Sequence, residues 1–182
     1  DKAIENPIRT MQNYTLGFHN LGIDARILLT NLSGFRKEEL EKNGIKIYEY
    51  FNESEKRNIV KEIVKWSPDI VHIHPCESEI IYKLKEILPQ KTIYIETNVF
   101  SIPQKYAGLL DASFQLSEWC LWNYQSREQL TKNKTLSLVM PNSVSCENFE
   151  KQSSEDNFNF RKQYKIPSDA IVFGRIGQPH KH

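Results

Sequence analysis

Several features that would assign this chain to a common class are missing from it. Its seven glycines include no G-x-G sequence, which the phosphate-binding turn of a nicotinamide-dependent dehydrogenase requires. No apolar run approaches the length of a membrane-spanning helix, about 20 residues, and no signal peptide is visible. The formal net charge is only +1, so the chain as a whole offers no excess charge to nucleic acid or to an anionic bilayer. These absences argue against a dehydrogenase, an integral membrane protein and a nucleic-acid-binding protein.

Cysteine is also scarce. Cys76, Cys120 and Cys146 are odd in number, far apart and in no C-x-x-C pair, so neither a disulfide framework nor a zinc knuckle is indicated. We expect reduced, buried thiols in a cytosolic protein. The remaining composition, 39% hydrophobic and 26% charged among 182 residues, is typical of a soluble globular domain with a sizeable core.

Short β-branched runs alternate along the chain with longer amphipathic stretches. We expect strands at residues 24–30, 45–50, 69–74, 92–96, 112–116 and 135–140. Strands that are separated by helical crossovers form parallel sheets with helices on both faces. The sequence therefore predicts an α/β fold built on a doubly wound parallel sheet.

Helix signals lie between these runs. A first helix is expected from Pro7 to a stop at Gly22, a second behind a capping box of Asn52 and Glu55, and others at residues 77–88 and 118–130, the last capped by Ser117. The apolar face expected on the first helix consists of Ile8, Met11, Thr15, Phe18 and Leu21.

The last forty residues suggest the start of a second domain. The polar run at residues 150–157 is typical of a linker, so we expect one domain over residues 1–150 and a linker helix with a first strand over 151–182. That strand, residues 170–173, leads into Gly174 and Arg175, and Lys181 follows six residues after the arginine. A glycine and two fixed cations at the end of a strand suit the binding of a diphosphate.

Motifs along the second half of the chain resemble glycosyltransferase family 4, whose members are retaining enzymes of the two-domain GT-B architecture. The matching segments are PDIVHIH at residues 68–74, DASFQLS at 111–117, Pro141-Asn142 with Val144 and Phe149, the helix followed by an IP-x-D/E-A pattern at 161–170, and Gly174-Arg175 with Lys181. Their order and spacing over residues 66–182 carry the resemblance, whereas residues 1–65 match only in pattern.

The resemblance implies a function. Residues 1–150 would be the Rossmann-like, acceptor-side domain of a hexosyltransferase, and residues 151–182 would begin the domain that binds the nucleotide-sugar donor. A sugar would pass with retention to a saccharide or lipid-linked acceptor, and Arg175 and Lys181 would stabilise the leaving diphosphate beside Gly174. No metal or other cofactor is implied. We expect a cytoplasmic enzyme of polysaccharide or glycolipid synthesis, at the inner face of the membrane if Lys83, Lys85 and Lys91 contact anionic lipid.

The chain also departs from the family pattern. Ser143 stands where the family usually has glycine, and residues 96–100 contain no histidine at a place where the family often has one. The paired-glutamate segment would lie beyond His182, and the opening strand with its glycine-rich loop would precede Asp1. We therefore expect a fragment that is truncated at both ends, inactive alone and lacking the central strand of its sheet.

Ligands of open α/β sheets bind at the carboxyl ends of the strands, which nominates His74, Glu96, Asn98 and Ser117 as cleft residues. Each has a structural alternative: Glu96 as a local hydrogen-bond partner, and His72 with His74 as packed side chains, with a metal pair as the weaker interpretation. Trp66, Trp119 and Trp122 either stack on sugar rings or serve the core and helix surfaces. For the whole chain, the alternative is a non-catalytic α/β binding or scaffold module.

Overall fold

The structure of the protein, a computed structural model, divides into two compact units, Asp1–Val144 and Ser145–His182. It describes residues 5–30, 36–74, 76, 78–131, 135–143 and 154–173. The boundary expected near residue 150 lies a few residues after this division. None of the described helices is long and apolar enough to cross a membrane.

The first unit alternates helices and strands. In chain order they are α1 (Glu5–Asn20), β1 (Arg26–Leu29), α2 (Arg36–Lys42), β2 (Lys46–Glu49), α3 (Lys56–Trp66), β3 (Ile70–Ile73), α4 (Ser78–Ile87), β4 (Ile93–Asn98), η2 (Ala107–Leu109), β5 (Ala112–Gln115), α5 (Glu118–Thr131) and β6 (Leu136–Val139). All six predicted strands are present, and β4 runs two residues further than expected. The short helix α2 was not predicted.

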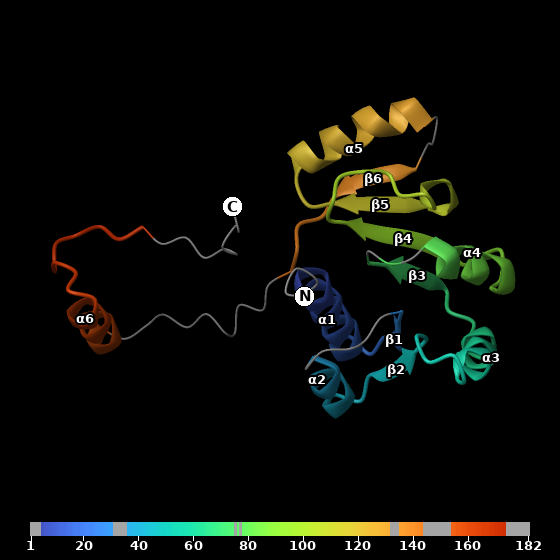
Figure 1. Ribbon diagram of the computed structural model, residues 1–182, viewed down its shortest axis with the longest axis horizontal. Helices are drawn as coiled ribbons and strands as arrows, with labels where there is room; N and C mark the ends of the chain where they lie inside the picture. Colours follow the sequence, from blue (N-terminus) through green and yellow to red (C-terminus); the bar gives the residue numbers. More distant parts are fainter. Residues whose placement is uncertain are drawn as a thin grey trace. The chain divides into compact units, whose positions relative to one another are not determined.

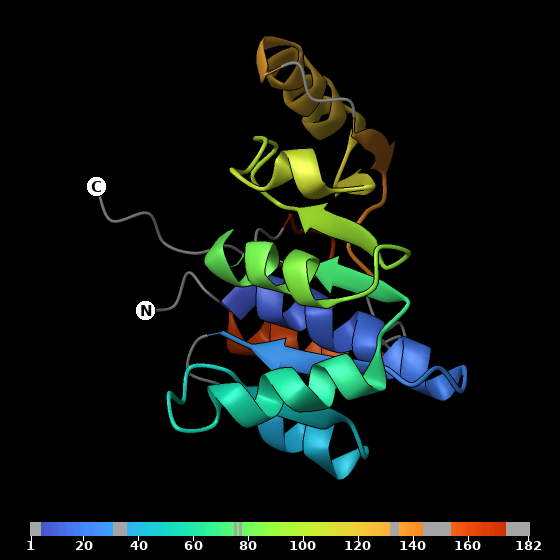
Figure 2. The ribbon, with the colours of Figure 1, turned by 90° about the vertical axis from the view of Figure 1, so that its right-hand side faces the viewer.

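Every strand pair is parallel, which confirms the α/β fold, but the strands form two sheets instead of one. β1 pairs with β2, and β3, β4, β5 and β6 form a four-stranded sheet in that order. No backbone hydrogen bond joins β1 to β3 within the described residues. In both ribbon views, α1 lies at a height between β1 and β3 (Figures 1 and 2).

One apolar core nevertheless connects the two sheets. Tyr48 of β2 packs in the same cluster as Ile73 of β3 and Tyr94 of β4, and Leu28 of β1 contacts this cluster. The helices α3 and α4 cover it with Ile59, Ile63, Ile80, Ile81 and Leu84. The sheets therefore share side-chain packing although they share no ladder of hydrogen bonds.

The opposite face of the four-stranded sheet is partly open. Side chains alternate between the faces of a strand, so His72 of β3 lies on the face opposite Ile73 and the α4 core. On this second face, four apolar side chains are exposed, those of Ile70, Ile93, Leu136 and Leu138. On α1, the predicted apolar face is also wrong in part, because Phe18 and Leu21 are exposed whereas the polar Thr10 and Gln12 are buried.

The helix α3 begins later than the capping box predicts. Its first turn follows Glu55, which makes no capping hydrogen bond through its side chain. The Oδ1 atom of Asn52 instead accepts hydrogen bonds from the backbone N–H (3.3 Å) and hydroxyl (2.8 Å) of Ser54. Asparagine side chains readily form such local turns, and here the turn takes the place of the predicted capping box.

The described part of the second unit consists of α6 (Ser154–Gln163) and the residues up to 173. Because α6 begins at Ser154, the predicted linker at 150–157 overlaps a helix. Acidic residues in its first turn and basic residues in its last turn complement the helix dipole. The strand predicted at residues 170–173 is absent, and Phe173 is 94% exposed. A strand needs a neighbour for its backbone hydrogen bonds, and the described residues of this unit include no other strand.

Candidate functional site

The predicted cleft residues lie at the carboxyl edge of the four-stranded sheet. His74 follows β3 and is half-buried, Glu96 and Asn98 belong to β4 and are buried, and Ser117 is exposed ahead of α5. Of these, the structure joins Glu96 and Asn98 directly. Gly174, Arg175 and Lys181, the predicted diphosphate site, lie outside the described residues.

The two histidines of β3 form a cluster with α1. The rings of His72 and His74 lie 4.7 Å apart, and the ring of Tyr14 lies 5.6 Å from His72 and 6.1 Å from His74. The Nε2 atom of His72 is 2.9 Å from the hydroxyl of Thr97. Within the described residues, the Nδ1 atom of His74 is buried from solvent and has no hydrogen-bond partner.

Burial keeps both histidines neutral. Desolvation lowers the pKa of His72 to about 4 and that of His74 to about 3, with a smaller contribution from His72 to the second value. A neutral imidazole can accept or donate one hydrogen bond at each nitrogen, depending on its tautomer. The cluster is therefore suited to orient a hydroxyl group and unsuited to bind phosphate as a cation.

Glu96 is 2% exposed and lies at the centre of a hydrogen-bond network. Its Oε1 atom accepts hydrogen bonds from the hydroxyl of Ser113 (2.6 Å) and the amide of Asn98 (3.1 Å), and the Tyr106 hydroxyl contributes another bond. The amide of Gln115 donates in turn to Ser113 (2.8 Å). Burial raises the pKa of the Glu96 carboxyl, and these hydrogen bonds oppose the rise. The network connects β4 to β5 and to the segment ahead of η2.

Asn98 organises the loop that follows β4. Its amide also donates to the carbonyl of Ile102 (2.9 Å), and its Oδ1 atom accepts the backbone N–H of Phe100 (3.0 Å). Both ends of its side chain thus bind the protein itself. Ser117 acts as predicted at the start of α5, because its hydroxyl accepts the N–H of Cys120 (3.2 Å).

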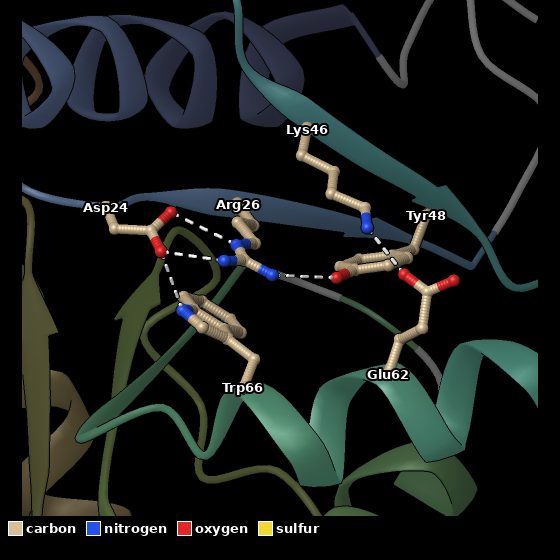
Figure 3. A network of polar contacts seen from close by, with 6 residues as sticks. All are labelled: Asp24, Arg26, Lys46, Tyr48, Glu62 and Trp66. Carbon is tan, nitrogen blue, oxygen red and sulfur yellow. Dashed lines mark hydrogen bonds and ion pairs between the residues drawn. The ribbon is translucent and has the colours of Figure 1, made fainter.

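A second polar network lies at the opposite, amino edge of the sheets (Figure 3). The Nε and Nη2 atoms of Arg26 donate to the two oxygens of Asp24 at 3.0 and 2.8 Å, and Nη1 donates to the Tyr48 hydroxyl at 3.1 Å. The guanidinium lies 4.4 Å from the centre of the Trp66 ring, whose Nε1 donates to Asp24 at 2.9 Å. Arg26 thereby connects β1 with β2 and with the end of α3.

Two shallow hollows lie on the surface of the first unit. One of about 450 Å³ adjoins the Arg26 network and includes His19, Gly22 and Gly44 in its lining. The other, of about 620 Å³, lies over α4 between Glu79, Lys83 and Leu109. The predicted site residues line neither hollow.

Sequence reasoning missed Tyr14, Ser113 and Gln115. Tyr14 faces the histidines from a helix whose predicted face did not include it. Ser113 and Gln115 are fully buried polar residues on β5, and their alternation with Ala112 and Phe114 was the one available signal. Their role depends on the pairing of Glu96 with Ser113 and of Asn98 with Gln115 across the sheet, which no local pattern indicates.

Comparison with known proteins shows the fold. No protein-family model matches the chain, and no curated protein matches it. Among solved structures, a glycosyltransferase from Rickettsia africae ESF-5 is similar with a TM-score of 0.60 and 18% sequence identity, over 90% of this chain. The chain spans 46% of that protein, or somewhat less than half of its length.

Proposed function

We propose that the first unit is the acceptor-side part of a glycosyltransferase that uses a nucleotide-sugar donor. The observation that supports this most is the fold similarity to the Rickettsia glycosyltransferase over 90% of the chain. The order of the family 4 motifs over residues 66–182 agrees with it. In this proposal a hexosyl group is transferred, with retention of configuration and without a metal, to a saccharide or glycolipid at the cytoplasmic side of the membrane.

The donor side of the proposal depends on Arg175 and Lys181. Glycosyl transfer releases a nucleoside diphosphate, whose negative charge grows as the glycosidic bond breaks. Fixed cations that stabilise this charge more strongly in the transition state than in the ground state accelerate the reaction. An arginine binds phosphate through two parallel N–H groups and a lysine adds a point charge, so this pair suits the leaving group.

The acceptor side of the proposal depends on the carboxyl edge of the four-stranded sheet. We infer that an acceptor binds near His74, which follows β3, and near the exposed Ser117 at the start of α5. Glu96 and Asn98 have a different part, because their polar atoms are bound within the protein. We assign them to holding the loop and the strand ends in place.

The test measures nucleoside diphosphate release by the complete natural polypeptide, supplied with a panel of UDP-, GDP- and dTDP-sugars and a mixture of oligosaccharide and lipid-linked acceptors. Arg175→Ala is expected to lower kcat/KM by about 10²- to 10³-fold, in line with the loss of a transition-state donor. Lys162→Ala, an exposed cation in the last turn of α6, is the matched control and is expected to change it less than about twofold. Release that persists unchanged in Arg175→Ala contradicts the proposed donor site, and no release with any donor favours the non-catalytic module.

A further inference from the structure

The last described residues of the first unit, 140–143, follow β6 and lie where the chain leaves this unit. We call them the exit segment; in Figure 1 it runs from the end of β6 toward α1. The backbone N–H of Met140 donates to the carbonyl of Gln115 at the end of β5 (2.8 Å). Residues 141–143 are exposed, and within the described part of the chain no backbone–backbone hydrogen bond holds them.

Two neighbouring side chains of α1 bind the exit segment. The amide of Asn13 donates to the carbonyl of Ser143 (2.9 Å), and the hydroxyl of Tyr14 donates to the carbonyl of Pro141 (3.3 Å). Burial raises the pKa of Tyr14 above its ordinary value, so the hydroxyl keeps the proton that it donates at neutral pH. These bonds join positions 130 and 127 residues apart, so they depend on the fold of the whole unit.

The helix α1 is a firm support for these two side chains. Met11 and Leu16 of the same helix pack against a buried apolar cluster formed by β1, α2 and the residue ahead of β2. The amide of Gln12 donates to the carboxylate of Glu39 on α2 (2.5 Å). Moving α1 with the exit segment would break these contacts, so Asn13 and Tyr14 bind the segment from a fixed position.

The same tyrosine connects the exit segment with the carboxyl edge of the four-stranded sheet. The ring of Tyr14 lies 5.6 Å from the ring of His72 and 6.1 Å from the ring of His74. A single side chain therefore spans the distance from these histidines to the carbonyl of Pro141. The chain leaves the first unit beside the edge that carries His74.

We propose that Asn13 and Tyr14 are positioning residues, which hold the exit of the chain beside the acceptor edge. The inference rests on the proposed transferase function, in which Arg175 and Lys181 follow this exit and bind the donor. A reaction between two bound substrates is fast only when both are held in the productive geometry. A fixed exit sets the point from which the chain continues toward the donor-binding residues, so it favours one geometry of the donor relative to an acceptor near His74.

The first experiment measures hydrogen exchange of single backbone amides in the 182-residue chain by mass spectrometry, and it requires no activity. Asn13→Ala combined with Tyr14→Phe, the exit variant, removes both hydrogen bonds and keeps the aromatic ring. The amide of Met140 should then exchange about tenfold faster, because two bonds that oppose opening of the exit segment are lost. The amide of Tyr50, which bonds to Leu29 in the two-stranded sheet, should exchange as in the wild type.

The matched control is Asn20→Ala combined with Tyr82→Phe. Asn20 is the exposed last residue of α1, and the Tyr82 hydroxyl also donates to a backbone carbonyl, that of Lys105, at 2.9 Å. This control should leave the exchange of Met140 unchanged. Unchanged exchange of Met140 in the exit variant would overturn the proposal. Equal acceleration at Met140 and Tyr50 would also overturn it, because it would show a general loss of stability.

The second experiment measures nucleoside diphosphate release by the complete natural polypeptide. The exit variant is expected to lower kcat about tenfold and to leave KM for the donor unchanged, because the proposed donor contacts are made by other residues. The control variant should keep both constants within about twofold of the wild type. A kcat that stays at the wild-type value in the exit variant, or falls equally in the control, would overturn the proposal.

The two experiments separate failure of this proposal from failure of the transferase function. Wild-type polypeptide that releases no nucleoside diphosphate would contradict the transferase function. The hydrogen exchange of Met140 would then decide by itself whether Asn13 and Tyr14 hold the exit segment.

Discussion

His72 and His74 make the stability of the first unit depend on pH. Their pKa values of about 4 and about 3 lie below the ordinary histidine value of 6.5. Below pH 6.5 the unfolded chain therefore binds more protons than the folded chain. The stability that the neutral imidazoles provide is complete above pH 6.5 and is lost as the pH falls toward 4 and 3.

We predict that replacing both histidines by glutamine flattens this dependence. Between pH 7 and pH 5 the free energy of unfolding of the wild type should fall by roughly 3 to 4 kcal/mol more than that of the His72→Gln/His74→Gln variant, or nearly 2 kcal/mol for each histidine. Urea unfolding followed by circular dichroism at the two pH values measures the difference. Glu96, whose raised pKa has the opposite effect, is present in both proteins and cancels. Parallel losses in the two proteins would show that the histidines titrate normally in the fold.

Ser113 is the residue on which the buried Glu96 network depends most. It donates to Glu96 and accepts from Gln115, and it is fully buried. Ser113→Ala removes one of the hydrogen bonds to Glu96 and the acceptor of the Gln115 amide, so we predict a loss of about 2 kcal/mol in the free energy of unfolding. Ser137→Ala, at the paired position on β6 and only half-buried, should cost less than about 0.5 kcal/mol. Equal urea midpoints for the two variants would contradict this role.

At the residue level, the sequence identified several residues near the strand ends, but it did not identify the side chains that bind them. A serine directly ahead of a helical stretch predicted a helix cap at Ser117, and the structure confirms it. Glu96 is bound by Ser113 and Tyr106, which are 17 and 10 positions further along the chain, and only the register of β4 with β5 brings Ser113 beside it. Such contacts depend on packing between elements, which a single sequence does not encode in any local pattern.

At the level of elements, Arg26 holds the two-stranded sheet against α3. We predict that Arg26→Ala lowers the free energy of unfolding by about 1 to 2 kcal/mol, mainly through lost packing on Trp66 and the lost bond to Tyr48. The ion pair itself contributes little, since Asp24 is well exposed. Lys46→Ala, on the neighbouring strand β2, removes the exposed ion pair with Glu62 of α3 and should lower the free energy of unfolding much less than Arg26→Ala does. Urea unfolding of both variants measures the two losses, and a larger loss for Lys46→Ala would contradict the role assigned to Arg26.

Elements with a strong local signal were predictable, and those that need a partner were not. The β-branched runs identified all six strands of the first unit, and the α/β alternation identified the parallel pairing. The residues at 170–173 have a composition like that of those strands, but they form no strand, and Ile171, Val172 and Phe173 are exposed. The physical reason is that a strand forms only beside another one. The capping box at Asn52 failed for a similar reason, since the side chain had a nearer partner in Ser54.

At the level of the whole molecule, the two separate sheets bear on how the chain behaves alone. β1 and β3 are not paired with each other in the described structure, and apolar side chains of β3, β4 and β6 are exposed on one face of the larger sheet. Unpaired strand edges and exposed apolar faces favour association. We therefore predict that the 182-residue chain unfolds broadly or self-associates at micromolar concentration. A sharp, two-state melt of a monomer in sedimentation velocity would contradict this expectation.

The central proposal is that Arg175 and Lys181 bind the diphosphate of a sugar nucleotide. Crystallising the complete natural polypeptide with a nucleoside diphosphate tests it most directly. The account predicts both side-chain cations within hydrogen-bonding distance of the phosphate oxygens, about 2.7 to 2.9 Å for such charged pairs. A nucleotide bound with its phosphates away from both residues would contradict it.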